Sequence, residues 1–114
     1  MTAYAIAHLR ATTVNEDVLR YIETIQATLD PFGGRFLVHG AQAEVVEGPW
    51  TGTVVVVAFP DTAAARAWYA SEAYQAILPL RTRHITGEVV IVDGVPDGYD
   101  ARTTAAALRA EAGL

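Results

Sequence analysis

The sequence predicts an α+β fold in which four strands and two helices follow the order β-α-β-β-α-β, with an extra helix near the C-terminal end. Three observations support this: short alternating or β-branched apolar runs in four places, two segments with helical spacing between them, and Gly- or Pro-containing turns at the junctions. At 114 residues and 52% apolar composition, the chain is long enough for one compact domain and too short for two ordinary ones.

The first strand and the first helix occupy the N-terminal third. Residues 3–10 alternate between two faces, as strand residues do. Thr13 and Glu16 have capping-box spacing, and apolar residues then recur every three or four positions, which predicts a helix from about Val14 to Leu29. Pro31 and the glycines after it end this helix, because proline cannot continue the hydrogen-bond ladder and glycine permits positive φ.

Two further strands precede the second helix. Arg35 to Val46 is predicted to be extended, with a bend or bulge near Gly40, where the alternation is poorest. Thr53 to Phe59 is an almost unbroken β-branched run, so we expect this strand to be buried on both faces. Asp61 is placed to cap a helix over Ala63 to Ala70.

The C-terminal half continues with helix, strand and helix. Ser71 can start a further helical piece through Leu78, which Pro79 then kinks or restarts. Glu88 to Asp93 is predicted to be the last strand, and the Ala-rich segment Ala101 to Ala112 is predicted to be a weakly amphipathic helix.

This order of elements is the split β-α-β, or ferredoxin-like, arrangement, in which both helices cover one face of a four-stranded antiparallel sheet. We assign residues 1–98 to this domain and residues 99–114 to a C-terminal helical tail. Because Val54 to Phe59 and Val89 to Val92 are apolar on both sides, the other face of the sheet also needs a cover. The sequence therefore predicts a homodimer that packs sheet against sheet about a twofold axis.

Composition argues against several classes of partner. Eight cationic side chains against thirteen acidic ones give a net charge of −5, which disfavours a nucleic-acid surface and a site for anionic membranes. No apolar run approaches the roughly 20 residues of a membrane-spanning helix, and the N-terminal segment lacks the features of a signal peptide, so we expect a cytoplasmic protein. The lack of cysteine excludes disulfides and thiolate metal sites.

The three histidines are the candidates for acid–base chemistry, because imidazole titrates nearest neutral pH. Their spacing is not that of a zinc motif, so a metal site would need the fold to gather them with Glu44 or Glu47, and we expect none. His39 ends an apolar run just before a glycine, where a strand commonly opens toward a pocket. It is the catalytic candidate, against the alternative of a hydrogen-bonded structural role. His8 is placed for the sheet edge or dimer seam, and His84 for a solvated helix end.

Arg81 follows Tyr74 by seven residues, so in a continuous helix the two share one face. An arginine beside aromatic rings suits a bound carboxylate or enolate, because it offers a permanent charge and paired donors. The alternative is that such an arginine bonds Glu47 or helix-end carbonyls and holds the dimer together.

Aromatic residues concentrate around the second helix and the hairpin before it, and most of them, including Trp68, should be core. Tyrosines that keep a polar hydroxyl can instead line a cavity between helix and sheet. The predicted catalytic residues are His39 and Arg81, and the predicted substrate-binding residues are Arg35, Trp50, Tyr69, Tyr74 and His8.

The run of motifs from Gly33 to Gly94 resembles the bacterial domain of unknown function 1330 family, of the dimeric α/β barrel superfamily. The matching positions are Gly33, Gly34, Arg35, Glu47, Gly48, Trp68, Tyr69, Tyr74 and Arg81. The resemblance implies a ferredoxin-like subunit and a dimeric barrel. Related barrels include monooxygenases, isomerases, cyclases and decarboxylases, so the fold does not choose a reaction.

The first functional hypothesis is a small enzyme without cofactor or metal that acts on an apolar or aromatic metabolite, in specialised metabolism, by proton transfer of the isomerase or cyclase type. A second is a dimer that binds or senses a small molecule without transforming it. A third is a haem-binding or monooxygenase-like protein, with a histidine as the axial ligand of haem. A fourth is a purely structural dimer.

Overall fold

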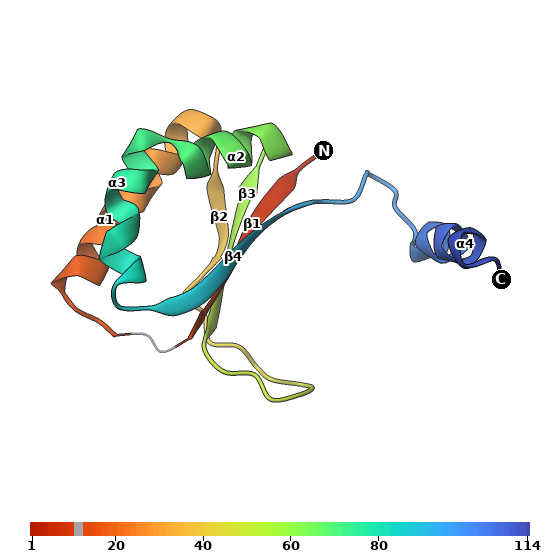
Figure 1. Ribbon diagram of the computed structural model, residues 1–114, viewed down its shortest axis with the longest axis horizontal. Helices are drawn as coiled ribbons and strands as arrows, with labels where there is room; N and C mark the ends of the chain where they lie inside the picture. Colours follow the sequence, from red (N-terminus) through yellow and green to blue (C-terminus); the bar gives the residue numbers. More distant parts are fainter. Residues whose placement is uncertain (11–12) are drawn as a thin grey trace.

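The computed structural model describes residues 1–10 and 13–114 of the chain. One four-stranded antiparallel sheet forms its centre, in the order β2-β3-β1-β4 (Figure 1). The strands are β1 (Ala3–Arg10), β2 (Arg35–His39), β3 (Thr53–Phe59) and β4 (Thr86–Asp93). With helices between β1 and β2 and between β3 and β4, this is the ferredoxin-like fold, and the prediction is confirmed.

Helices α1 (Glu16–Leu29), α2 (Thr62–Ala70) and α3 (Glu72–Thr82) all lie on one face of the sheet (Figure 1). The side chain of Asn15 caps α1 by accepting a hydrogen bond from the backbone N–H of Val18. The prediction of a start at Val14 with Thr13 in a capping box was therefore wrong. Asparagine is as good an N-cap as threonine, and here it is the residue at the boundary.

The predicted caps of the second helical region are confirmed. Asp61 accepts from the backbone N–H of Ala64 to begin α2, and Ser71 accepts from that of Tyr74 to begin α3. Pro79 neither ends nor restarts α3, which continues to Thr82. The interruption between the two helices is at Ser71, whose extended backbone turns the chain.

Strand β2 is shorter than predicted. It ends at His39 instead of Val46, because Gly40 has φ +86 and turns the chain out of the sheet. The bend predicted near Gly40 is thus present, and a separate irregularity lies three residues earlier. Phe36 pairs with Val57, and two residues later Val38 pairs with the adjacent Val56, so Leu37 is the extra residue of a β-bulge.

The bulge changes which face of the sheet His39 occupies. Phe36 and His39 pair with Val57 and Val55, which are two residues apart and so share the helix-covered face. In a regular strand, residues three apart point to opposite faces. The bulge therefore brings both rings to the same side, where they stack with centroids 4.3 Å apart.

The core lies between the sheet and the three helices, and Trp68 is part of it, as predicted. Its side chain is 3% exposed, and its indole N–H donates to the hydroxyl of Thr28 over 3.0 Å. The buried cluster comprises Ala5, Tyr21, Ile25, Leu29, Val57, Phe59, Ala65, Trp68 and Tyr74.

The other face of the sheet is uncovered within the single chain. Val90 and Val92 of β4 are 51% and 43% exposed. Beside Val90 in the sheet lies Ile6, and Ile6 in turn pairs with Val56. The sequence predicted that these strands are buried on both faces. In a single copy of the chain, only the face toward the helices is covered.

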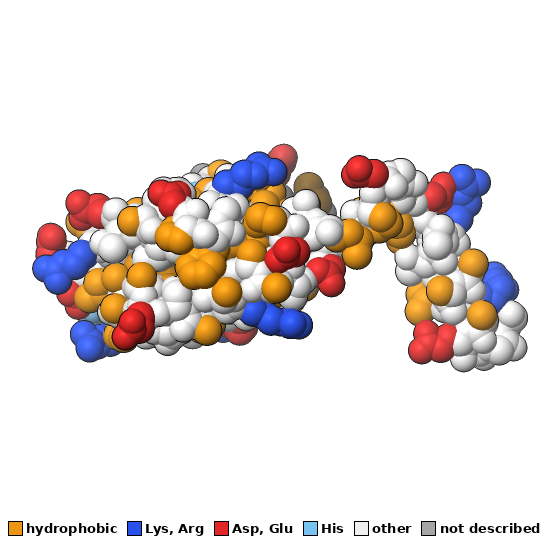
Figure 2. All heavy atoms as spheres, turned by 90° about the horizontal axis from the view of Figure 1, so that it is seen from above, with side chains coloured by type: hydrophobic (Ala, Val, Ile, Leu, Met, Phe, Trp, Pro, Cys, Tyr) orange, Lys and Arg blue, Asp and Glu red, His pale blue; other side chains and the backbone are white. Residues whose placement is uncertain are grey.

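The predicted tail helix is present as α4 (Ala101–Ala112). It follows the segment after β4 and lies away from the rest of the molecule, on the side of the uncovered face (Figures 1 and 2). All of its residues are exposed. A helix of this length is marginal in water by itself. Its N-cap Asp100, its αL C-cap Gly113 and a hydrogen bond between the hydroxyls of Tyr99 and Thr104 stabilise it.

Two glycines of the loop between β2 and β3 provide a matched test of the fold. Gly52 and Gly40 have almost the same φ, +87 and +86, but a Cβ at Gly52 would lie 2.1 Å from the backbone oxygen of Leu9, and one at Gly40 meets nothing within 4 Å. We expect Gly52→Ala to lower the free energy of unfolding by about 3 kcal/mol or more, and Gly40→Ala by only about 1 kcal/mol. Urea unfolding followed by circular dichroism measures both, and equal losses would contradict the close contact.

Candidate functional site

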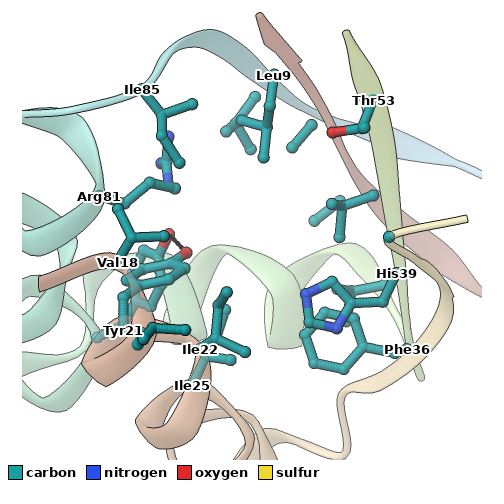
Figure 3. Close-up of a pocket in the computed structure, with 18 of the residues that line it drawn as sticks. Leu9, Val18, Tyr21, Ile22, Ile25, Phe36, His39, Thr53, Arg81 and Ile85 are labelled. Atoms are coloured by element: carbon teal, nitrogen blue, oxygen red, sulfur yellow. Dashed lines mark hydrogen bonds between the residues drawn. The ribbon is translucent and has the colours of Figure 1, made fainter. Parts of the chain in front are cut away.

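A cavity of about 320 Å³ lies between α1, α3 and the covered face of the sheet (Figure 3). Its volume is at the lower end of the range for small-molecule sites. The wall is mostly aliphatic and aromatic, with residues from α1, α2 and α3 and from all four strands. These residues are Ala5, Ala7, Leu9, Val14, Val18, Leu19, Tyr21, Ile22, Ile25, Phe36, His39, Gly40, Thr53, Val55, Val57, Trp68, Tyr74, Arg81, Ile85 and Val89.

The cavity exists because β1 presents small side chains to α1. On the covered face of β1, Ala5 and Ala7 carry only methyl groups. Their neighbours in the sheet, Val57 and Val55, are also short. These side chains cannot reach α1 at this level, so space remains beneath the helix.

A pair of tyrosines forms one polar group of the wall. The hydroxyls of Tyr21 and Tyr74 share a hydrogen bond of 2.7 Å in the buried part of the site (Figure 3). Burial, with the Tyr74 hydroxyl beside it, raises the pKa of Tyr21 well above its usual range, so this phenol is neutral. One of the two hydroxyls donates within the pair, which leaves the hydrogen of the other for a ligand.

Arg81 is the only charged residue that is buried among those the structure describes, at 6% exposed. Its guanidinium carbon lies 5.6 Å from the centroid of the Tyr21 ring. Burial acts to lower the pKa of Arg81, but the phenols of Tyr21 and Tyr74 act the other way and leave it raised, so the side chain is a cation. Tyr74 and Arg81 face the same cavity, as their helical spacing predicted.

Within the part of the chain that the structure describes, Arg81 bonds neither Glu47 nor a helix-end carbonyl. Glu47 is exposed in the loop between β2 and β3. The ion pairs of the described residues are Arg10–Glu88, His84–Asp17 and Arg102–Asp100, and none involves Arg81. The structural role that the sequence left open for this arginine is therefore not seen in the single chain.

His39 lies at the end of β2, at the rim of the cavity. Its ring stacks on Phe36 with an interplanar angle of 8° and makes no hydrogen bond to another described residue. Stacking therefore holds the ring, and its nitrogens stay available. Figure 3 shows His39 and Arg81 on opposite sides of the cavity.

The other predicted site residues lie elsewhere. Trp50 and His8 stack on each other, 4.2 Å between ring centroids, and His8 also shares a 2.7 Å hydrogen bond with the backbone oxygen of Thr51. This pair is on the uncovered face, because His8 alternates with the cavity residues of β1. Arg35 is exposed at the start of β2. Tyr69 lines a second hollow beside β4, which Arg81 also reaches.

Sequence reasoning missed Tyr21, although a signal was present. Tyr21 lies three residues after Val18 and four before Ile25, so it belongs to the apolar stripe of α1. Its role depends on the contact with Tyr74, 53 residues away, which no local pattern reveals.

The third histidine is not part of the cavity. His84 pairs with Asp17 at 3.0 Å, and this hydrogen bond lowers the pKa of the Asp17 carboxyl. Among residues 1–10 and 13–114, no three His, Asp or Glu side chains are grouped so that they might bind a metal ion. Over the same residues, no helix is long and apolar enough to cross a membrane.

Residues 2–95 match the family model of the domain of unknown function DUF1330, and the chain belongs to this family. The match covers the sheet and the three helices on it, and ends before the segment that leads to α4. No curated protein is significantly similar to the chain in sequence.

Solved structures with the same fold are distant in sequence. A protein of unknown function from Rhodopseudomonas palustris, RPA0582, is 14% identical, with 83% of each chain covered and a TM-score of 0.64. SnoaB of Streptomyces nogalater, a cofactor-independent oxygenase, is 13% identical over 87% of this chain and 98% of its own, with a TM-score of 0.58. A dimeric ferredoxin-like protein of unknown function from Jannaschia sp. CCS1 is 16% identical over 82% and 100%, with a TM-score of 0.57. These likenesses establish the fold.

The tyrosine pair is open to a double-mutant cycle. Tyr21→Phe and Tyr74→Phe each leave one buried hydroxyl without its partner, so we expect each to lower the free energy of unfolding by about 1–2 kcal/mol. The double variant should lose less than the sum, with a coupling of about 1 kcal/mol. Urea unfolding is the measurement, and Tyr69→Phe, outside the pair, should change little. Strictly additive losses would contradict the shared hydrogen bond.

Proposed function

We propose that the protein binds an apolar or aromatic metabolite in the cavity between α1, α3 and the sheet, and catalyses a proton transfer on it without a cofactor. The observation that carries this is the arrangement of the wall. His39 from β2 and Arg81 from α3, 42 residues apart in the sequence, border one apolar cavity whose other polar groups are few.

In this proposal His39 is the group that removes or returns the proton. Its ring is at the rim, stacked on Phe36, and its nitrogens are free of hydrogen bonds to other described residues. Histidine suits this role because its pKa lies near neutrality. Arg81 supplies a cation for negative charge on the ligand. Because the cavity wall has few polar groups, it favours isomerisation or cyclisation next to a carbonyl group.

The description of SnoaB as a cofactor-independent oxygenase is compatible with chemistry of this kind on the same fold. Fold likeness does not transfer a reaction, so the proposal rests on the cavity. A role in bacterial specialised metabolism and a cytoplasmic location are part of the same proposal.

We also propose that the protein is a homodimer through the uncovered face of the sheet. Ile6, Val56 and Val90 form an apolar row across three strands of this face. An exposed apolar sheet face is unfavourable in water, and a second copy provides a matching surface. The dimeric neighbour from Jannaschia supports this assembly. Residues 1–98 would form the dimerising domain, with residues 99–114 as an appended tail.

Proton exchange into a probe tests the catalytic proposal. 4-Acetylbenzoate carries an enolisable methyl ketone and a carboxylate at opposite ends of an aromatic ring, and its acetyl protons exchange for deuterium in D₂O at a rate that proton NMR follows. We expect the protein to accelerate this exchange and His39→Gln to reduce the acceleration by about 100-fold or more, because it removes the base. His84→Gln, outside the cavity, should retain full acceleration. Binding of 4-acetylbenzoate with no acceleration would contradict the catalytic part and favour a non-catalytic binding protein.

The dimer is tested by placing a charge on the uncovered face. We expect the wild-type protein to sediment as a dimer and Val90→Asp as a monomer, because a carboxylate buried between the sheets has no partner. Val46→Asp is the matched control, since Val46 is 88% exposed in the loop after β2. Sedimentation equilibrium measures all three. A wild-type mass of one chain at every concentration would rule out the assembly.

A further inference from the structure

Arg81 is a buried cation for which the chain provides no anion. The two residues outside the described part are alanine and threonine, so every Asp and Glu side chain lies within it. No carboxylate oxygen of these residues lies within 4.0 Å of a guanidinium nitrogen of Arg81, the distance that defines an ion pair. Burying a guanidinium without a counter-charge is expensive, so its surroundings favour an anion that the protein itself does not supply.

The donors of Arg81 are available to such an anion. No described side-chain nitrogen or oxygen is both sealed from solvent and without a hydrogen-bond partner. Any guanidinium nitrogen that lacks a protein partner is therefore in contact with solvent, and Arg81 lines both the cavity and the adjoining hollow. The hydroxyl pair of Tyr21 and Tyr74 lies on the same side of the cavity and offers one further donor (Figure 3).

The position of Arg81 indicates that it binds a permanent negative charge on the ligand and not the transient charge of an enolate. An enolate carries its negative charge mainly on the carbonyl oxygen, two bonds from the carbon that loses the proton, so this charge develops on the His39 side of the cavity. Arg81 lies across the cavity from His39, with the apolar side chain of Ile22 in the wall between (Figure 3). A cation in this position is suited to a charged group at the other end of the ligand.

We infer that the ligand is an aromatic or alicyclic organic acid whose carboxylate binds Arg81, with its apolar body in the cavity and its reactive end toward His39. The inference rests on the proposed use of the cavity and adds the chemical class of the ligand. A planar guanidinium binds a carboxylate through two parallel hydrogen bonds, and the tyrosine pair supplies a third donor.

A consequence for stability separates this role from a structural one. If Arg81 held the fold together, replacing it would lower the stability of the protein. Replacing a buried cation that has no counter-charge does not lower stability, because an apolar side chain of similar length avoids the cost of desolvating the charge. Arg81→Met should therefore leave the melting temperature of the ligand-free protein unchanged or raise it.

A matched pair of probes tests the ligand class. Isothermal titration of the wild-type protein with 2-naphthoate and with the neutral 2-naphthamide should show about tenfold or greater preference for the acid. Arg81→Met should bind the two within about threefold of each other, and Arg81→Lys, which keeps the charge but not the paired donors, should keep a reduced preference. Ala7→Phe fills the cavity and should abolish binding of both, whereas Ile6→Phe, on the other face of the same strand, should not.

The outcomes separate the two proposals. Equal binding of acid and amide by the wild-type protein, or an acid preference that survives in Arg81→Met, overturns the inference and leaves the cavity as a binding site. Binding of the acid that survives Ala7→Phe places it elsewhere and also overturns the inference, as does a lowered melting temperature of Arg81→Met. An acid preference that depends on Arg81, without proton exchange into 4-acetylbenzoate, supports the ligand class and removes the catalytic function.

Discussion

The β-bulge at Leu37 is the feature on which the candidate site depends. If the same residues formed a regular strand, with Leu37 paired like its neighbours, His39 would lie on the face opposite to Phe36, away from the helices, and the cavity would have no histidine at its rim. With it, the two rings stack on the covered face and close one side of the cavity. The bulged pairing of this outer strand thus determines whether the histidine faces the cavity.

The residues around the cavity lower the stability of the protein, whereas the rest of the fold raises it. The alanines of β1 leave space beneath α1, and a well-packed core would fill it. Arg81 places a charge among apolar side chains with no counter-ion from the chain. In contrast, the opposite end of the same layer is closely packed, with Trp68 bonded to Thr28 and almost fully buried. A well-packed core beside a site that lowers stability is the usual pattern where a pocket is retained for function.

The sequence predicted the order of elements correctly because that order depends on local periodicity and caps. Asp61, Ser71 and the tail helix lie where the pattern placed them. Residues 41–46 were predicted to be strand because they are extended in character, yet they have no neighbouring strand to pair with in the described structure. Strand pairing is a tertiary property, and neither the early end of β2 nor the bulge could be predicted from the composition of β2 alone.

The same distinction applies to the candidate site. His39, Tyr74 and Arg81 border the cavity as their spacing and position suggested, whereas Arg35, Trp50 and His8 do not. Alternation along β1 already separates His8 from the cavity residues beside it, but only the closed sheet shows which face the helices cover.

The two faces of the sheet separate assembly from ligand binding. The cavity and all of its polar groups lie on the covered face, whereas the proposed dimer uses the uncovered one. Because consecutive strand residues point to opposite sides, Ile6 and Ala7 belong to different surfaces although they are neighbours in the chain. In the proposed dimer each copy would therefore carry its own cavity, whose wall comes from a single chain. A partner subunit would cover apolar surface and stabilise the sheet, while the chemistry of the ligand depends on residues of one chain.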